Sequence, residues 1–375
     1  MGAVVPAPMT DEWRRTVQQK LLAWFERHRR DLPWRRTRDP YAVLVSEFLL
    51  QQTTVEAARR YFEPFLRRFP TVHDLAAAPL DEVLRLWAGL GYYARARHLH
   101  ATAQRIVREF GGQVPADLKT LQKLPGIGRY TAGAIASIAY GIKVPALDTN
   151  AVRVLARLLG WQGDPKSAAF QKALRDIAST LLPDEAPGEF NQAVMDLAAL
   201  ICAPEAPKCG VCPLQTLCAA AATGTPERFP APSKSQTLTE RQEVACVVWR
   251  DDRLLVAQRG KGQWWNGLWE CPRGERHRDE PVPAAAQRIA RERVGLTVAP
   301  EQVLTTLQHT VTRYRIVLAV VRCRYLAGEV RPNGYAAARW VTLDEAEQLP
   351  SPSPQRELLE RLRQEQTGGR QMALF

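Results

Sequence analysis

The spacing of apolar side chains changes once along this chain and divides it into two parts. Up to about residue 222, apolar residues recur every three or four positions, which predicts helices. Beyond residue 243, short β-branched segments alternate with helical ones, which predicts an α+β domain. The expected helices cover 13–25, 41–50, 82–90, 99–110, 151–159, 170–182, 189–201, 283–294 and 343–349, and the expected strands cover 244–249, 254–258 and 316–325.

The stretch between the two patterns, 223–243, opens with a run rich in Pro, Gly, Ser and Thr, which is typical of an extended linker. The predicted domains are therefore 1–222 and 244–365, followed by a flexible tail, 366–375, that contains two glycines. No apolar run approaches the roughly 18 residues needed to span a bilayer. The first ten residues lack the order of a secretion signal. We expect an intracellular, cytoplasmic monomer with no membrane partner.

Composition adds a candidate partner. The apolar content of 46% is ample for packed cores, and the formal charge is +12. An excess of positive charge points to a polyanion, most simply nucleic acid, although a merely basic protein has the same composition.

A glycine-rich segment carries the first motif. Asp117 can cap a short helix that runs through Leu124. Pro125, Gly126 and Gly128 then break that helix and allow a tight hairpin with exposed N–H groups. Such a hairpin before a second helix suits a nucleic-acid phosphate and cannot read sequence. An ordinary corner between two helices shows the same pattern.

Four of the seven cysteines have the spacing C-x6-C-x2-C-x5-C within seventeen residues, 202–218. One short pair flanked by wider gaps favours a cubane iron–sulfur cluster, and zinc remains the alternative. The other three cysteines have no ligand spacing and are expected to be buried. The four candidate ligands are Cys202, Cys209, Cys212 and Cys218.

Two carboxylates are candidates for acid–base chemistry. Glu47 is the only charge in the apolar run 41–53, where burial would raise its pKa and keep it protonated. An arginine partner or a solvent-facing position is the alternative. Asp148 follows a proline-containing turn and precedes a basic helix, where it could simply be an N-cap. Together the two can break a base–sugar bond, because one protonates the departing base while the other faces the positive sugar.

These motifs resemble the helix-hairpin-helix DNA glycosylase superfamily and, within it, the MutY family of adenine DNA glycosylases. The resemblance implies a monofunctional base-excision repair hydrolase with one 4Fe-4S cluster, acting on adenine opposite 8-oxoguanine or guanine in double-stranded DNA. It also implies a bacterial, nucleoid-associated location. The matching segments are Leu32–Arg35, Val45–Thr53, Gly89–Tyr93, Leu124–Gly133 and Phe190–Gln192.

The resemblance assigns roles to matching positions. Glu47 would protonate adenine N7, Asp148 would stabilise the oxocarbenium-like sugar, and Tyr130 and Asn150 would assist. Endonuclease III-like relatives place a lysine at the position of Tyr130, where it forms a Schiff base; a phenol cannot, so no strand cleavage is expected. The adenine pocket would be lined by Trp34, Arg35, Leu50 and Gln192, the duplex would be entered by Gln52, Thr53 and Tyr92, and the DNA backbone would be bound at Gly126 and Gly128.

The second domain resembles the MutT-like Nudix domain of the same family. Ile289 and Arg293 replace two glutamates that a hydrolytic Nudix box requires, so we expect lesion recognition and no pyrophosphatase activity. Where relatives carry Phe-Ser-His, this chain carries Val-Thr-Arg at 311–313. Thr312 keeps a hydroxyl, and together with His309 it is the expected contact with 8-oxoguanine.

The last five residues resemble the pentapeptide by which bacterial proteins bind the replicative sliding clamp, through Gln371, Leu374 and Phe375. Two other functions stay open: a thymine or uracil mismatch glycosylase on the same scaffold, and a non-catalytic iron–sulfur DNA-binding redox sensor. Gln192 and the second domain favour adenine, and the presence of both carboxylates favours catalysis.

Overall fold

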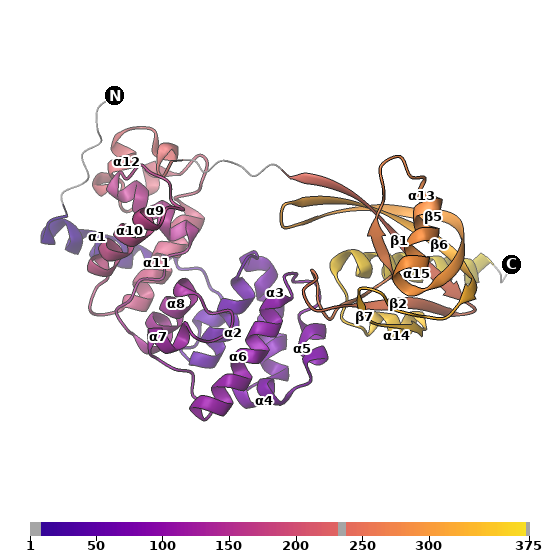
Figure 1. Ribbon diagram of the computed structural model, residues 1–375. Coiled ribbons are helices and arrows are strands. Elements are labelled where there is room, and N and C mark those ends of the chain that lie inside the picture. Colours follow the sequence, from indigo (N-terminus) through magenta and orange to yellow (C-terminus); the bar gives the residue numbers. More distant parts are fainter. Residues whose placement is uncertain (1–8, 232–237, 373–375) are drawn as a thin grey trace. The chain divides into compact units, whose positions relative to one another are not determined.

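The structure is a computed structural model that describes residues 9–231 and 238–372, and the chain divides into two compact units (Figure 1). The first unit contains Met1–Ala77 and His98–Ser235, and the second contains Ala78–Arg97 and Gln236–Phe375. The predicted fold class, a helical part followed by an α+β part, is confirmed. Among the described residues, no helix has the length and apolar character of a membrane span.

The first unit consists of helices joined by loops, with no strand among its described residues. Apolar side chains of α1, α9, α10 and α11 form one core, which includes Leu21, Leu155, Leu174 and Leu197. Helix α2 is buried from Tyr41 to Leu49, because apolar residues occupy all of its faces. The elements are α1 (Asp11–His28), η1 (Pro33–Arg35), α2 (Pro40–Leu50), α3 (Val55–Arg68), α4 (Val72–Ala77), α6 (Ala94–Phe110, which crosses from the second unit), α7 (Leu118–Leu121), α8 (Arg129–Tyr140), α9 (Thr149–Leu159), α10 (Ala168–Leu181), α11 (Pro187–Leu200), η2 (Cys209–Val211), η3 (Gln215–Leu217), α12 (Ala219–Ala222) and η4 (Pro226–Arg228).

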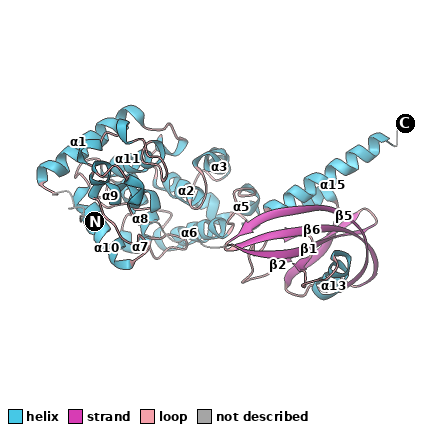
Figure 2. Cartoon of the chain, turned by 90° about the horizontal axis from the view of Figure 1, so that it is seen from above, coloured by secondary structure: helices cyan, strands magenta, loops and turns pink. Residues whose placement is uncertain are grey.

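The second unit is a twisted sheet with helices on both faces (Figure 2). Its strand order is β3-β2-β1-β6-β5, with β4 on β1 and β7 on β2; β1 and β6 run parallel, and the other pairs are antiparallel. Helix α13 packs on one face, and α14 and α15 pack on the other. The elements are α5 (Leu80–Leu86), β1 (Thr239–Arg250), β2 (Arg253–Arg259), β3 (Trp269–Glu270), β4 (Arg273–Glu275), α13 (Val282–Val294), β5 (Leu296–Val311), β6 (Tyr314–Gly328), β7 (Tyr335–Val341), α14 (Leu343–Glu347) and α15 (Ser353–Met372).

Three segments differ from the expected organisation. Residues 78–97 group with the sheet unit, although they lie early in the chain. Strand β1 begins at Thr239, inside the expected linker 223–243. The expected flexible tail from Gln366 is helical up to Met372, because α15 is anchored by buried Leu358 and Leu362 and continues through both glycines. Gln371 falls within α15, while Leu374 and Phe375 lie outside the described residues.

Candidate active site and DNA-binding hairpin

The glycine-rich hairpin joins α7 to α8, as predicted. Asp117 caps α7 by accepting a hydrogen bond of 2.8 Å from the backbone N–H of Thr120. Gly126 is left-handed (φ +75°), and a Cβ there would lie only 2.7 Å from the side chain of His98. Gly128 is exposed immediately before α8, whose first-turn N–H groups have no carbonyl partner within the helix. The hairpin therefore presents backbone donors that suit a phosphate.

The loop before Asp148 is held against α8 by close packing and by one buried amide. A Cβ at Gly133 would come 2.5 Å from the carbonyl oxygen of Pro145, so this approach requires glycine. On α11, the buried Asn191 accepts a hydrogen bond of 3.1 Å from the N–H of Ala146. The Asn191 amide also donates to a loop carbonyl and to a hydroxyl of α8. The loop is thus fixed to two helices just before Asp148.

Asp148 is the N-cap of α9, as one of the two sequence-based alternatives proposed. Its Oδ1 accepts from the backbone N–H of Ala151 at 2.7 Å, and its Oδ2 accepts from Nδ2 of Asn150 at 2.8 Å. The carboxylate is half-buried and sits at the positive end of the helix dipole. Capping and catalysis are compatible here, because each oxygen retains a further lone pair.

Glu47 is buried in α2 with 4% of its surface exposed. Burial raises its pKa to about 7; a hydrogen bond with Tyr130 opposes this shift, and the nearby charge of Asp148 adds to it. Its Oε2 lies buried without a hydrogen-bond partner among the described residues. A carboxyl group with this pKa carries its proton about half of the time at pH 7. Glu47 can therefore act as a general acid.

Tyr130, in the first turn of α8, is half-buried between the two carboxylates. Burial raises the pKa of its phenol well above the ordinary value, and the charges of Glu47 and Asp148 raise it further. The phenol therefore stays protonated and can donate to Glu47. The structure thus brings together Glu47, Tyr130 and Asp148 from α2, α8 and the start of α9.

A third carboxylate at this site was not predicted from the sequence. Asp196 on α11 is fully buried and accepts from both terminal nitrogens of Arg35, at 2.6 and 2.9 Å. The Nε of Arg30 donates to it at 2.6 Å. Burial alone would raise the pKa of Asp196, but the hydrogen bonds and charges of Arg35 and Arg30 hold it below its usual range. Asp196 is the only charge in an otherwise apolar stretch, which is the signal that singled out Glu47.

The other expected pocket residues lie on these same elements. Trp34, in η1, is buried, and its ring meets that of Phe62 edge-on with 5.6 Å between the centroids. Arg35 is hydrogen-bonded to Asp196. Leu50 ends α2 and is half-buried, as is Gln192 on α11.

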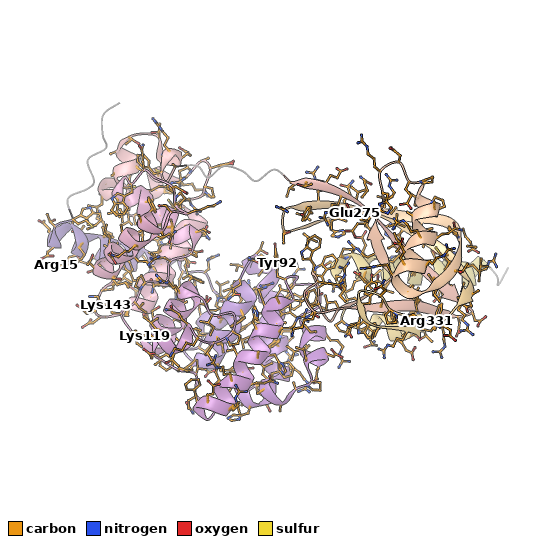
Figure 3. The ribbon with its side chains drawn as sticks, in the orientation of Figure 1. Arg15, Tyr92, Lys119, Lys143, Glu275 and Arg331 are labelled. Atoms are coloured by element: carbon orange, nitrogen blue, oxygen red, sulfur yellow. The ribbon has the colours of Figure 1, made fainter. Side chains whose placement is uncertain are left out.

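The residues expected to enter the duplex lie in loops. Gln52 is exposed and left-handed (φ +52°), and Thr53 next to it is half-buried. Tyr92, in the segment that groups with the second unit, is also left-handed and is 54% exposed (Figure 3). Left-handed backbone is unusual for non-glycine residues and concentrates at functional sites. Gln51 links its loop to the hairpin by donating to the carbonyl of Gly126 at 3.2 Å.

Two arginines of α9 contact the cysteine loop. Arg153 donates from Nε to the carbonyl of Cys202 at 2.9 Å and from Nη1 to Oδ1 of Asn150 at 2.9 Å. Arg157 is buried, and its Nη1 lies 3.5 Å from Sγ of Cys202. Nη1 of Arg157 also donates to the carbonyl of Ala203, and its Nη2 donates to the carbonyl of Pro204. Neither arginine's contact was predicted.

The four expected ligand cysteines gather in this loop as free thiols, and three of them pack on the core of the first unit. Burial raises the pKa of Cys212 to about 11, and the other three thiols contribute to the shift as near neighbours. In the part of the chain that the structure describes, no three Cys, His, Asp or Glu side chains lie close enough together to hold a metal ion. Four thiols in one loop are a donor set that fits a cluster.

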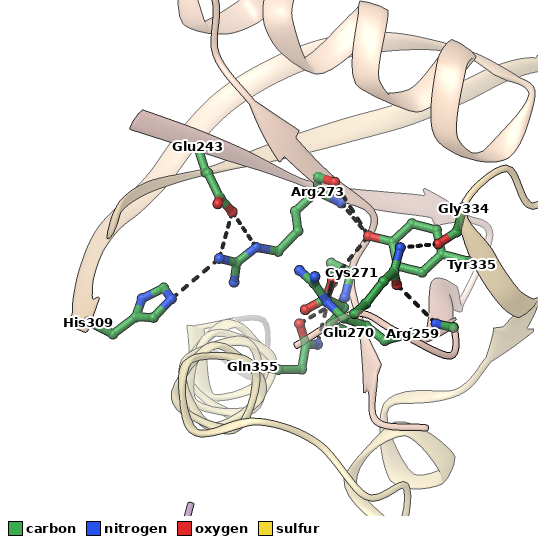
Figure 4. Close-up of polar contacts among 11 residues, drawn as sticks. Glu243, Arg259, Glu270, Cys271, Arg273, His309, Gly334, Tyr335 and Gln355 are labelled. Carbon is green, nitrogen blue, oxygen red and sulfur yellow. Dashed lines mark hydrogen bonds and ion pairs between the residues drawn. The ribbon is translucent and has the colours of Figure 1, made fainter. Parts of the chain in front are cut away.

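In the second unit, His309 lies near the end of β5, and Thr312 lies exposed in the β5–β6 turn. Nη2 of Arg273 lies 3.3 Å from Nε2 of His309, and Arg273 also pairs with the buried Glu243 (Figure 4). Burial, followed by the charge of Arg273, lowers the pKa of His309 to about 4. His309 is therefore neutral at pH 7 and is tied to the sheet. Thr312 is left-handed (φ +52°).

The residues of the Nudix box form ion pairs and packing contacts within the second unit. Glu280 is paired with Arg288 at 2.8 Å, and the hydrogen bond from Arg288 lowers the pKa of Glu280 to about 2. Ile289 is buried against Gly274, and the guanidinium of Arg293 lies 5.1 Å from the ring of Tyr335. An aliphatic and a cationic side chain therefore stand where a hydrolase needs carboxylates.

Two neighbouring carboxylates beside a hairpin with exposed backbone donors are the arrangement expected of a base-excision DNA glycosylase. In agreement, the model of the HhH-GPD superfamily of base excision DNA repair proteins matches residues 45–179, and a NUDIX domain model matches residues 244–361. The adenine DNA glycosylases of rat and human are each 34% identical, over 88% and 87% of this chain and 74% and 70% of their own lengths. The chain belongs to the adenine DNA glycosylase family.

Solved structures support the helical fold. A thermostable thymine-DNA glycosylase is 34% identical with a TM-score of 0.53, covering 57% of this chain and 98% of that one. An endonuclease III structure with DNA is 25% identical with a TM-score of 0.50, covering 58% and 98%. Both likenesses support the helical DNA glycosylase fold of the first unit.

Proposed function

We propose that this protein removes adenine mispaired with 8-oxoguanine or guanine by hydrolysing its N-glycosidic bond. The observation that carries the proposal is the pairing of a buried, protonatable Glu47 with a hydrogen-bonded Asp148 across Tyr130. A target base inside a duplex is out of reach, so the nucleotide must turn out of the stack. Gln52 and Tyr92, which both have left-handed backbone in loops, are the residues proposed to enter the vacated space.

Glu47 supplies the proton to adenine N7, which turns the base into a better leaving group. Its raised pKa keeps the proton available near neutrality, and Oε2 is free to face the base. Asp148 faces the positive charge that develops on the sugar as the bond breaks. Asn150 and the Ala151 N–H hold that carboxylate in one orientation.

The same arrangement supports a monofunctional reaction. Position 130 carries a phenol, which cannot form a Schiff base with the sugar aldehyde. Water therefore completes the reaction, and the product is an abasic site. Arg35, which is held by Asp196, keeps a positive charge near Glu47 and lowers its pKa slightly against the effect of burial.

The second unit contributes lesion recognition in this proposal. Thr312 at the turn offers a hydroxyl, and His309 lies close behind it on β5. The adjacent Val311 and Arg313 provide an aliphatic contact and a cation.

The cysteine loop binds one 4Fe-4S cluster in this proposal, through Cys202, Cys209, Cys212 and Cys218. The cluster would hold the loop 202–218 in one conformation and, through Arg153 and Arg157, hold α9 against that loop. The terminal Gln371, Leu374 and Phe375 are proposed to bind the replicative sliding clamp.

A base-release assay over a panel of duplexes tests the proposal. Adenine opposite 8-oxoguanine and opposite guanine should be released, while thymine and uracil opposite guanine and adenine opposite thymine should not. Release of thymine or uracil instead of adenine would favour the mismatch glycosylase, for which the thymine-DNA glycosylase likeness is the supporting observation. Binding without release of any base would leave the redox-sensor alternative.

A further inference from the structure

One buried arginine holds the turn that carries Tyr92. Nη2 of Arg95, in the first turn of α6, donates to the carbonyl of Gly91 at 3.0 Å and to that of Leu90 at 3.3 Å. Its guanidinium lies over the Tyr92 ring, 5.8 Å from the ring centre, and over the Trp87 ring, 5.3 Å away. Burial lowers the pKa of Arg95 to about 10, so the side chain is still a cation at pH 7. A single cation therefore contacts two carbonyls of the turn and two rings.

The turn depends on such contacts, because its backbone is unusual. Gly89, Gly91 and Tyr92 are left-handed, with φ +104°, +75° and +47°. A left-handed tyrosine persists only where the surrounding contacts determine its conformation. The carbonyl of Gly91 accepts a second hydrogen bond, of 3.2 Å, from Nε1 of Trp87. The contacts of the neighbouring residues thus fix the backbone on which the exposed Tyr92 stands.

Tyr93, the next residue, ties the same turn to the sheet of the second unit. Its buried hydroxyl accepts from the N–H of Gly89 at 3.3 Å and donates to the carbonyl of Ser351 at 2.8 Å. Ser351 is buried in the segment between α14 and α15. The carbonyl of Pro350, just before it, accepts a hydrogen bond of 2.8 Å from the N–H of Trp269. The turn is therefore anchored to β3.

We infer that Arg95 and Tyr93 are positioning residues, which hold the Tyr92 turn in a single conformation for entry into a duplex before DNA binds. The inference rests on the proposed function for the entry of Tyr92 into DNA. A loop that is already ordered loses little conformational entropy when it binds. Without these contacts the turn would be competent for only a fraction of the time, and entry would become rarer in proportion.

The opening of the base stack tests this inference. The full chain would be mixed rapidly with a duplex that carries 2-aminopurine beside the 8-oxoguanine and a target adenosine that resists hydrolysis. Stacking quenches 2-aminopurine, so its emission rises when a side chain opens the stack, and Tyr92→Ala should remove most of this rise. Arg95→Gln should slow the rise by about 10-fold or more, and Tyr93→Phe by about 2- to 10-fold, as expected for lost hydrogen bonds of a charged and a neutral group.

Arg85→Gln is the matched control, because Arg85 is an exposed arginine of α5 in the same segment, and it should leave the rate of the rise unchanged. Tyr93→Phe removes a single oxygen atom and decides the case if Arg95→Gln does not fold. Unaltered rates for both positioning variants, or equal slowing by the control, would overturn the inference alone. A full rise in Tyr92→Ala would overturn it together with the proposed entry of Tyr92. Because no base is released in this assay, its result is independent of the test of adenine release.

Discussion

Arg153 donates a hydrogen bond of 2.9 Å to the carbonyl oxygen of Cys202. Its other side reaches the active site, because Arg153 also bonds Asn150, which in turn bonds Asp148. The cysteine loop and the candidate catalytic carboxylate are thereby joined by three consecutive hydrogen bonds.

Arg153→Met should therefore slow base release by about 10- to 100-fold, because hydrogen bonds of charged groups contribute roughly 1.5–3 kcal/mol. The expected loss is in the rate of single-turnover adenine release, since Asn150 would no longer be fixed against Asp148. Lys172→Ala, on the exposed ion pair of α10, is the control and should be neutral. An unaltered rate for Arg153→Met would show that the link is structural only.

Asp196→Asn should destabilise the first unit by about 3–5 kcal/mol, because it leaves two arginine side chains without their buried counter-charge. Denaturant unfolding would measure the change. Asp31→Asn is the matched control: Asp31 pairs with Arg36 at the exposed surface, so its loss should leave the free energy of unfolding nearly unchanged. Equal effects for the two variants would contradict the account of Asp196.

Glu47→Gln should stabilise the protein at alkaline pH while disabling it. The pKa of Glu47 is raised from 4.5 to about 7, so its folded form binds the proton more tightly than its unfolded form does. The contribution of this group to the free energy of unfolding is thus fully present below pH 4.5 and falls as pH rises through 7. Above that pH the contribution is lower by about 3 kcal/mol. Denaturant unfolding of Glu47→Gln and of the unmodified protein should be measured at pH 5 and pH 8. The difference between their free energies of unfolding should grow with pH, and a constant difference would contradict the raised pKa of Glu47.

Tyr130→Phe should move the pH dependence of adenine release. The hydrogen bond from Tyr130 lowers the pKa of Glu47, so removing it raises that pKa. The rate falls on the alkaline side as Glu47 loses its proton, and in Tyr130→Phe this fall should occur at higher pH. A single-turnover pH profile would show it. A fall at the same or a lower pH would mean that Tyr130 does not donate to Glu47.

The local signals in the sequence predicted much of the first unit. The Asp117 cap, the glycines after it and the lone charge of Glu47 each depend on a few neighbouring residues. By contrast, Asp196 is hydrogen-bonded to Arg30, which lies 166 positions away in the sequence, and no local pattern predicts such a partner. The grouping of residues 78–97 with the second unit has the same long-range origin.

In the second unit, β5 was not predicted as a strand. Its register shifts at three places, one of them beside Pro300, so apolar and polar residues do not alternate regularly along it. The fold class was still predictable, because β1 and β6 are rich in β-branched residues and β2 carries a short apolar run. The roles of His309 and Thr312 stay predictions.

Single-turnover adenine release by Glu47→Gln and Asp148→Asn, measured alongside duplex binding, tests the central claim most directly. If a buried acid and a facing carboxylate divide the chemistry, both variants should bind the adenine·8-oxoguanine duplex and release no measurable adenine. Release by either variant at the rate of the unmodified protein would contradict the account.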